Sequence, residues 1–114
     1  MERILQLIGL AKRAGKITAG TELVEKEISR GRAKLLILAT DISPEVKKNL
    51  LYICEKAQIA SIILCDKITL GLCIGKGQRV ALAIQDRGFA DAIMKEVRKS
   101  NGGLNTVEVV EWQK

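Results

Sequence analysis

Side chains able to carry covalent or metal chemistry are scarce in this sequence. Histidine is absent, which removes the commonest general base and metal ligand. The three cysteines, Cys54, Cys65 and Cys73, form no C-x-x-C pair and lie in apolar stretches without an activating neighbour. We interpret them as buried, reduced thiols of a cytoplasmic protein. The acidic residues show no metal-ligand spacing, so we expect no enzyme, no metal and no cofactor.

The stretch AGTELVEKEISRG, residues 19–31, places Glu22, Lys26 and Arg30 four residues apart on one helix face. One interpretation is a solvated face on which Glu22 and Lys26 form an exposed ion pair. The other is a ligand site. Gly20 and Thr21 would then offer free backbone N–H groups to a phosphate at the helix start, and Lys26 and Arg30 would extend that face.

A second stretch, GLCIGKGQR at residues 71–79, contains three glycines and two cations. It lacks the G-x-x-x-x-G-K-[ST] pattern of a Walker A loop. It also precedes a predicted strand, whereas a dinucleotide fingerprint joins a strand to a following helix. We predict a loop in which glycine lets another backbone segment approach closely, with Ile74 exposed beside it.

The stretch ATDISPEVKK, residues 39–48, ends a predicted strand and opens a helix. Ser43 suits the N-cap and Pro44 the first helical position. Asp41 is also expected to act as a capping residue. Lys47 and Lys48 should lie near the same edge of the sheet as the two stretches above.

The bulk composition favours an anionic partner. The chain has 114 residues, enough for one domain with its own core, and carries a net charge of +6. Nucleic acid is the first candidate for such a partner. Tyr52, Phe89 and Trp112 are the only aromatic residues, too few for a platform that stacks single-stranded bases. No signal peptide and no bilayer-spanning apolar run is found, so we expect a cytoplasmic protein.

Apolar periodicity predicts alternating helices and strands. A first helix ends near Gly15, and an extended link follows at 16–19. A second helix, between Gly20 and Gly31, turns Leu23, Val24 and Ile28 inward. The other expected helices are 44–58, a short one from Asp66 to about 72, and 88–99; the expected strands are 34–40, 61–65 and 79–85, with an edge strand at 106–112. This order predicts a layered α/β/α domain with a largely parallel sheet, in which function gathers at strand ends and helix N-termini.

Three segments together resemble a known family. GLAKRAGKITAGTELVEKEI, KLLILATDISP and LGLCIGK...RVALAIQDRGFA are similar to the L-seven-Ae ribosomal-protein superfamily, in particular its bacterial YlxQ-type branch. The similarity covers about residues 4 to 98. It implies a domain at 1–99, a three-layer α/β/α sandwich with a mixed, roughly four-stranded sheet, and a C-terminal tail at 100–114. It also implies binding to kink-turn RNA, a helix–internal loop–helix element with tandem sheared G·A pairs.

The resemblance also assigns roles to residues. Gly20 and Thr21 match the Gly-Thr at the helix that enters the groove at the G·A pairs, and Lys26 matches the lysine that contacts those bases. Ile74 and Lys76 lead into a hydrophobic loop that caps flipped-out nucleotides. Glu22 and Leu23 depart from the family, because archaeal members carry Asn-Glu there. The expected RNA-binding set is Gly20, Thr21, Glu22, Lys26, Arg30, Asp41, Lys67, Leu70, Gly71, Ile74, Gly75 and Lys76.

We therefore expect a monomeric protein that recognises kink-turn RNA and is associated with the ribosome or translation. One alternative is a protein-interaction module on the same fold with the RNA face lost, which would show an apolar surface patch and little salt dependence. A second alternative is a small-ligand enzyme that uses the glycine loop, which would show a deep pocket with convergent polar groups.

Overall fold

The computed structural model describes residues 1–101 and 107–112. Helices and strands alternate through most of the chain, as the periodicity predicts. The elements are α1 (Glu2–Arg13), β1 (Ile17–Ala19), α2 (Thr21–Ser29), β2 (Leu35–Ala39), α3 (Pro44–Ala57), β3 (Ser61–Cys65), α4 (Lys67–Leu72), β4 (Ala81–Ile84), α5 (Arg87–Ser100) and β5 (Glu108–Val110).

The sheet has five strands in the order β1-β4-β2-β3-β5. Only β2 and β3 pair in parallel; the other three pairs are antiparallel. The mixed sheet confirms the fold that the resemblance implies, although it has five strands where roughly four were expected. The expectation of a largely parallel sheet was wrong. Residues 17–19 read as a link because three residues are too few to show alternation. Residues 66–80 hold one short helix, α4, and after it β4 runs antiparallel to β2.

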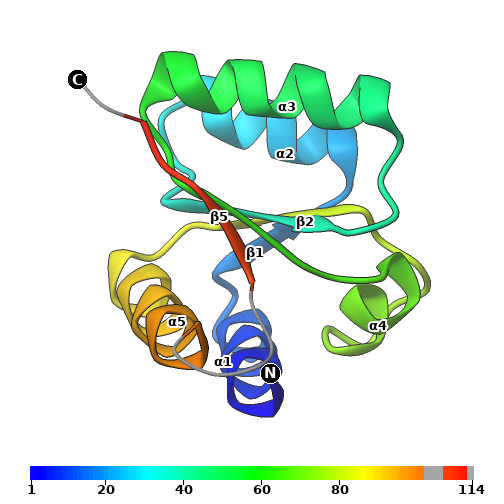
Figure 1. Ribbon diagram of the computed structural model, residues 1–114, viewed down its shortest axis with the longest axis vertical. Coiled ribbons are helices and arrows are strands. Elements are labelled where there is room, and N and C mark those ends of the chain that lie inside the picture. Colours follow the sequence, from blue (N-terminus) through cyan, green and yellow to red (C-terminus); the bar gives the residue numbers. More distant parts are fainter. Residues whose placement is uncertain (102–106, 113–114) are drawn as a thin grey trace.

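Helices cover both faces of the sheet, so the three-layer α/β/α arrangement is confirmed (Figure 1). All five residues of β2 are buried. Leu36 and Leu38 belong to the apolar core under α2 and α3, whereas Leu35, Ile37 and Ala39 belong to the core shared with α1 and α5. The unbroken apolar run of β2 follows from this burial on both faces.

Helix α2 presents a narrow apolar stripe to the sheet. Val24 and Ile28 are buried there, but Leu23 is 55% exposed. The expectation that Leu23 faces inward was wrong, because successive helical residues differ by about 100° in direction. Val24 and Ile28 lie one turn apart on one face, and Leu23 falls outside the arc that α2 buries.

Capping side chains fix where the later helices begin. The Ser43 hydroxyl accepts from Val46 N at the start of α3, as predicted. Asp66 accepts from the backbone N–H groups of Ile68 and Thr69 at the start of α4. Each bond satisfies a donor that the first helical turn cannot satisfy itself.

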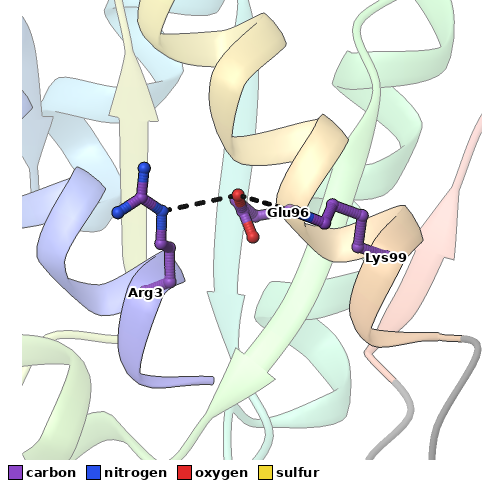
Figure 2. A network of polar contacts seen from close by, with 3 residues as sticks. All are labelled: Arg3, Glu96 and Lys99. Atoms are coloured by element: carbon purple, nitrogen blue, oxygen red, sulfur yellow. Dashed lines mark ion pairs between the residues drawn. The ribbon is translucent and has the colours of Figure 1, made fainter.

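Helices α1 and α5 lie side by side below the sheet and share a small polar network (Figure 2). Glu96 Oε1 lies 3.5 Å from Arg3 Nε and 3.8 Å from Lys99 Nζ. Both cations are largely exposed, so the network contributes at most about 1 kcal/mol. The packing of the buried apolar residues of the two helices contributes more to their association than this network does.

The C-terminal segment is tied to the sheet through β5, which pairs antiparallel with β3. The Asn101 side chain exchanges two hydrogen bonds with the backbone of Val107, and Trp112 Nε1 donates to the Ile59 carbonyl at 2.9 Å. Part of the turn expected at SNGG and the start of the strand expected at 106 lie outside the described residues.

Candidate nucleic-acid interface

One edge of the sheet collects the chain segments that carry most of the predicted site. We call it the α4 edge: it consists of the C-terminal ends of β1, β2 and β3 and the N-terminal end of β4. Three backbone bonds join these ends: Gly20 N to Ala81 O at 3.1 Å, Ala39 N to Val80 O at 2.9 Å and Thr40 N to Cys65 O at 2.9 Å. Helices α2, α3 and α4 all begin at this edge, on the right in Figure 1.

The N-terminus of α2 leaves backbone donors free at this edge. Gly20 is the N-cap residue with φ of 99°, and no side chain caps the helix. Within the described part of the chain, the N–H groups of Thr21, Glu22 and Leu23 have no hydrogen-bond partner. Free N–H groups and the positive end of the helix dipole together favour an anion.

Lys26 lies one turn further along α2 and is exposed. Between the described residues, no ion pair joins it to Glu22, so the paired-face interpretation is not supported. Arg30 is the C-cap residue at the far end of the nine-residue helix. At 1.5 Å per residue, it lies about 13 Å of helix rise from Thr21. The structure therefore keeps Lys26 near the α4 edge and separates Arg30 from it.

Asp41 positions the start of α4. Its Oδ1 accepts a hydrogen bond of 2.9 Å from the backbone N–H of Lys67, and the Lys67 carbonyl accepts one of 3.0 Å from Arg79 N. These bonds connect the ends of β2 and β3 to the approach to β4. Asp41 thus serves the local structure, as its expected capping role implies. Arg79, which the sequence prediction assigned to a strand, is instead brought beside Lys67.

The glycine loop folds back onto α4. A Cβ on Gly71 would meet the Gly77 carbonyl oxygen at 1.8 Å, far inside any real contact distance. The Gly71 carbonyl also accepts from Lys76 N at 2.9 Å, and Gly75 adopts a φ of 72°. The expectation that glycine permits a close backbone approach is confirmed. Lys76, at the turn of this loop, is exposed.

Ile74, however, points into the protein. It is only 5% exposed and joins the core cluster with α1 and α5, as does the fully buried Leu70. The expectation of an exposed Ile74 was wrong. The loop turns back on itself through the bond from Ile74 N to Gly71 O, and this turn directs the side chain inward.

Two other apolar residues of α4 are exposed in its place. Ile68 is 60% and Leu72 is 69% exposed, and their spacing of four puts them on one helix face. Leu10 of α1 is 46% exposed and lines a cleft of about 560 Å³ together with Cys73, the neighbour of Leu72. We call Ile68, Leu72 and Leu10 the apolar ledge. Sequence reasoning missed it, because a six-residue helix is too short to show which face is buried.

Three ionisable groups beside α4, Asp66, Cys65 and Cys73, have shifted pKa values. Hydrogen bonds from the Thr69 hydroxyl and from backbone N–H groups lower the pKa of Asp66. Burial is the main cause that raises the pKa of Cys65 to about 12, with smaller contributions from Cys73 and nearby carboxylates. Burial likewise raises the pKa of Cys73 to about 11. Both groups are therefore thiols at neutral pH, which agrees with their predicted inert role.

The described residues contain neither a group of metal ligands nor a membrane-spanning helix. Among residues 1–101 and 107–112, no group of three or more cysteines and carboxylates is arranged to hold a metal ion. In the same residues, no helix combines the length and the apolar character needed to cross a membrane.

Comparison with known proteins identifies the family. Residues 2–94 match the ribosomal protein L7Ae/L30e/S12e/Gadd45 family. The chain belongs to this family. It is 39% identical over 88 residues to the RNA-binding protein YlxQ of Bacillus subtilis (strain 168), covering 77% of this chain and 88% of that protein. It is 33% identical over 95 residues to the large ribosomal subunit protein eL8 of Picrophilus torridus, covering 82% of this chain and 75% of that protein.

Solved structures share this fold. A Bacillus halodurans protein of unknown function superposes with a TM-score of 0.79 at 36% identity, covering 81% of this chain and 93% of that one. The Giardia lamblia 15.5kD RNA binding protein superposes with a TM-score of 0.73 at 23% identity, over 86% and 84% of the two chains. The predicted L7Ae-type fold and its bacterial YlxQ branch are confirmed. The description of the family names ribosomal proteins and does not name an enzymatic activity.

Proposed function

We propose that this protein binds structured RNA at the α4 edge and that a kink-turn is its preferred target. The observation that carries the proposal is the uncapped N-terminus of α2, which the bond from Gly20 N to Ala81 O joins to the start of β4, the strand that follows the glycine loop. The names of two relatives, an RNA-binding protein and a large ribosomal subunit protein, support RNA as the ligand. They also support association with the ribosome, and hence action in the cytoplasm.

The residues of the α4 edge divide into two roles. The free N–H groups of Thr21 and its neighbours hold a phosphate, and Lys26 contacts the base edges or backbone at the sheared G·A pairs. Lys67, Lys76 and Arg79 line the approach from the glycine loop and neutralise further phosphates.

The apolar ledge takes the capping role that the resemblance implied for Ile74. Ile68 and Leu72 expose aliphatic side chains on the outer face of α4, next to the cation at position 67. A flipped-out nucleotide has lost its stacking partners, and packing its base on these side chains removes apolar surface from water.

A gel-shift titration at one physiological salt concentration tests this proposal. The protein is titrated against a kink-turn hairpin and against a duplex of equal length in which the G·A pairs are replaced by Watson–Crick pairs. We expect tighter binding to the kink-turn. Equal affinity for the two RNAs would refute kink-turn recognition and leave a nonspecific basic protein.

The apolar ledge also favours a second candidate function, a protein-interaction module. Exposed Ile68 and Leu72, and exposed Leu10 in the lining of a cleft of about 560 Å³, are features that protein partners use. The salt dependence separates the two functions. RNA binding weakens steeply as salt rises, because phosphate contacts release counterions, whereas an apolar protein interface changes little.

A further inference from the structure

Cations also gather at the edge of the sheet opposite the α4 edge. Three neighbouring strands end there, in the order β1, β4, β2. Lys16 precedes β1, Lys34 precedes β2, and Arg87 follows β4 as the first residue of α5. Backbone bonds fix this arrangement: Lys34 N donates to Ile84 O at 2.7 Å, and Gln85 N donates to Lys16 O at 2.9 Å. We call these three cations the basic row.

Adjacent strands lie about 4.8 Å apart, so the backbones of the basic row follow one another across the sheet edge. Lys16 and Arg87 are exposed and Lys34 is half-buried. None of the three forms an ion pair with a residue that the structure describes. They are therefore available to an anion that runs across the strand ends.

Complementing a helix dipole explains Lys16, which follows the C-terminal end of α1, but it does not explain Lys34 or Arg87. A cation is stabilised at a helix C-terminus, as Arg30 is at the end of α2. Arg87 instead begins α5, where the dipole is positive and disfavours a cation, and Lys34 belongs to no helix. Binding of a ligand by the basic row, and not stabilisation of the fold, accounts for this placement.

A cleft of about 380 Å³ opens beside the row. Lys34 and Arg87 line it, as does the loop that begins at Gly31. Arg98 lines the far end but is held by Glu111 at 2.9 Å, which leaves Lys34 and Arg87 as the cleft cations without a described partner. Asp91 also lines the cleft, and its carboxylate repels a phosphate placed next to it.

We propose that the basic row and this cleft form a second RNA contact, which binds the phosphate backbone of a segment outside the kink. The inference rests on the proposed RNA-binding function. The two edges are separated by the length of β2, five residues or about 17 Å, so one lengthened stem of the same RNA can reach both. A protein gripping RNA at both edges would hold two parts of a folded RNA at a fixed distance.

The test compares two RNAs and two charge-matched double variants. One RNA is a kink-turn hairpin with short stems that reaches only the α4 edge; the other has one stem lengthened to reach the opposite edge. Lys34→Gln/Arg87→Gln removes two cations from the cleft. Arg3→Gln/Lys99→Gln removes two cations of the network in Figure 2, which do not line it. Thermal melting checks that both variants are folded.

We expect Lys34→Gln/Arg87→Gln to bind the long RNA roughly tenfold more weakly, with unchanged binding to the short hairpin, because two phosphate contacts are lost. The charge-preserving variant Lys34→Arg/Arg87→Lys should restore most of the affinity. Asp91→Asn should bind the long RNA more tightly, since it removes a carboxylate from the cleft.

Three results would overturn the second contact. The first is unchanged affinity of Lys34→Gln/Arg87→Gln for the long RNA, and the second is an equal loss in the Arg3→Gln/Lys99→Gln control. The third is unchanged or weaker binding by Asp91→Asn. Failure of the proposed function is seen separately, as absence of a kink-turn preference in the wild-type protein. In that case, binding of the same variants to a plain duplex tests the second contact.

Discussion

Lys26 is exposed on α2 and has no described ion-pair partner, so its charge is available to a ligand. We expect Lys26→Ala to weaken kink-turn binding by about 1–3 kcal/mol, the usual value of one base or phosphate contact. Circular dichroism should show an unchanged fold. Unfolding of this variant would mean that Lys26 supports the structure and that its predicted outward role is wrong.

Glu22 is an exposed anion in the first turn of α2, where the free N–H groups lie. We expect Glu22→Asn to strengthen kink-turn binding. A carboxylate about 4 Å from a phosphate costs on the order of 1 kcal/mol or more, and asparagine adds N–H donors. Titration of both proteins against one kink-turn RNA at two salt concentrations measures the gain. A loss of affinity would instead identify Glu22 as an acceptor for guanine N–H groups.

Ile74 and Leu72 make a matched pair two residues apart, one buried and one exposed. Ile74→Asp should lower the stability by about 2–4 kcal/mol or more, because it places a charge in the core. Leu72→Asp should leave the melting temperature almost unchanged and weaken binding to a kink-turn, since a carboxylate repels the RNA backbone. Normal RNA affinity of Leu72→Asp, in a folded protein, would remove the capping role of the apolar ledge.

At the scale of elements, α4 and its loop depend on the contact between Gly71 and Gly77. We expect Gly71→Ala to destabilise the protein by about 1–3 kcal/mol or more, because a methyl group cannot occupy the position of the Gly77 carbonyl. Gly77→Ala is the control, since the nearest atom to its added Cβ is Arg79 Nη1 at 4.0 Å. Chemical denaturation compares the two, and equal stabilities would contradict the tight packing of this loop.

The α4 edge gains its electrostatic character from the arrangement of three helices. Helices α2, α3 and α4 all start there, so the positive ends of their dipoles lie at the same edge of the sheet, although α4 covers the opposite face from α2 and α3. At the starts of α3 and α4, the side chains of Ser43 and Asp66 accept hydrogen bonds from backbone N–H groups, whereas the start of α2 has no side-chain cap. Because of this difference between the helices, we propose α2 as the one that holds a phosphate.

For the whole molecule, cations lie at two opposite edges of the sheet, and the chain carries a net charge of +6. We expect the affinity for a long kink-turn RNA to fall steeply with salt, by about one unit of log–log slope per phosphate neutralised. The short hairpin should give a shallower slope than the long RNA, because only the α4 edge is engaged. Equal slopes for the two RNAs would argue against a two-edged grip, and slopes near zero would favour the protein-interaction module.

Much of the fold could be predicted from local pattern. The apolar runs at 35–39 and 62–65 favour burial on both faces, and the strands there pair with each other inside the sheet. Ser43 and Asp66 mark helix starts because their side chains accept from free backbone N–H groups. Glycine at position 20 likewise indicates the start of α2, and the three-segment resemblance adds the family.

The sequence by itself determined the helices and every strand except β1, because propensity, capping and periodicity act over a few residues. Only the tertiary structure decided which side chains face solvent in short elements. In the run ITLGLCI, Ile68 and Leu72 are exposed while Leu70 and Ile74 are buried, and nothing in their chemistry distinguishes them. The tertiary structure also decided three further features: the antiparallel direction of β4, the separation of Arg30 from the α4 edge and the basic row at the opposite edge. Each depends on contacts between residues far apart in the chain, where packing of whole elements, and not local preference, determines the free energy.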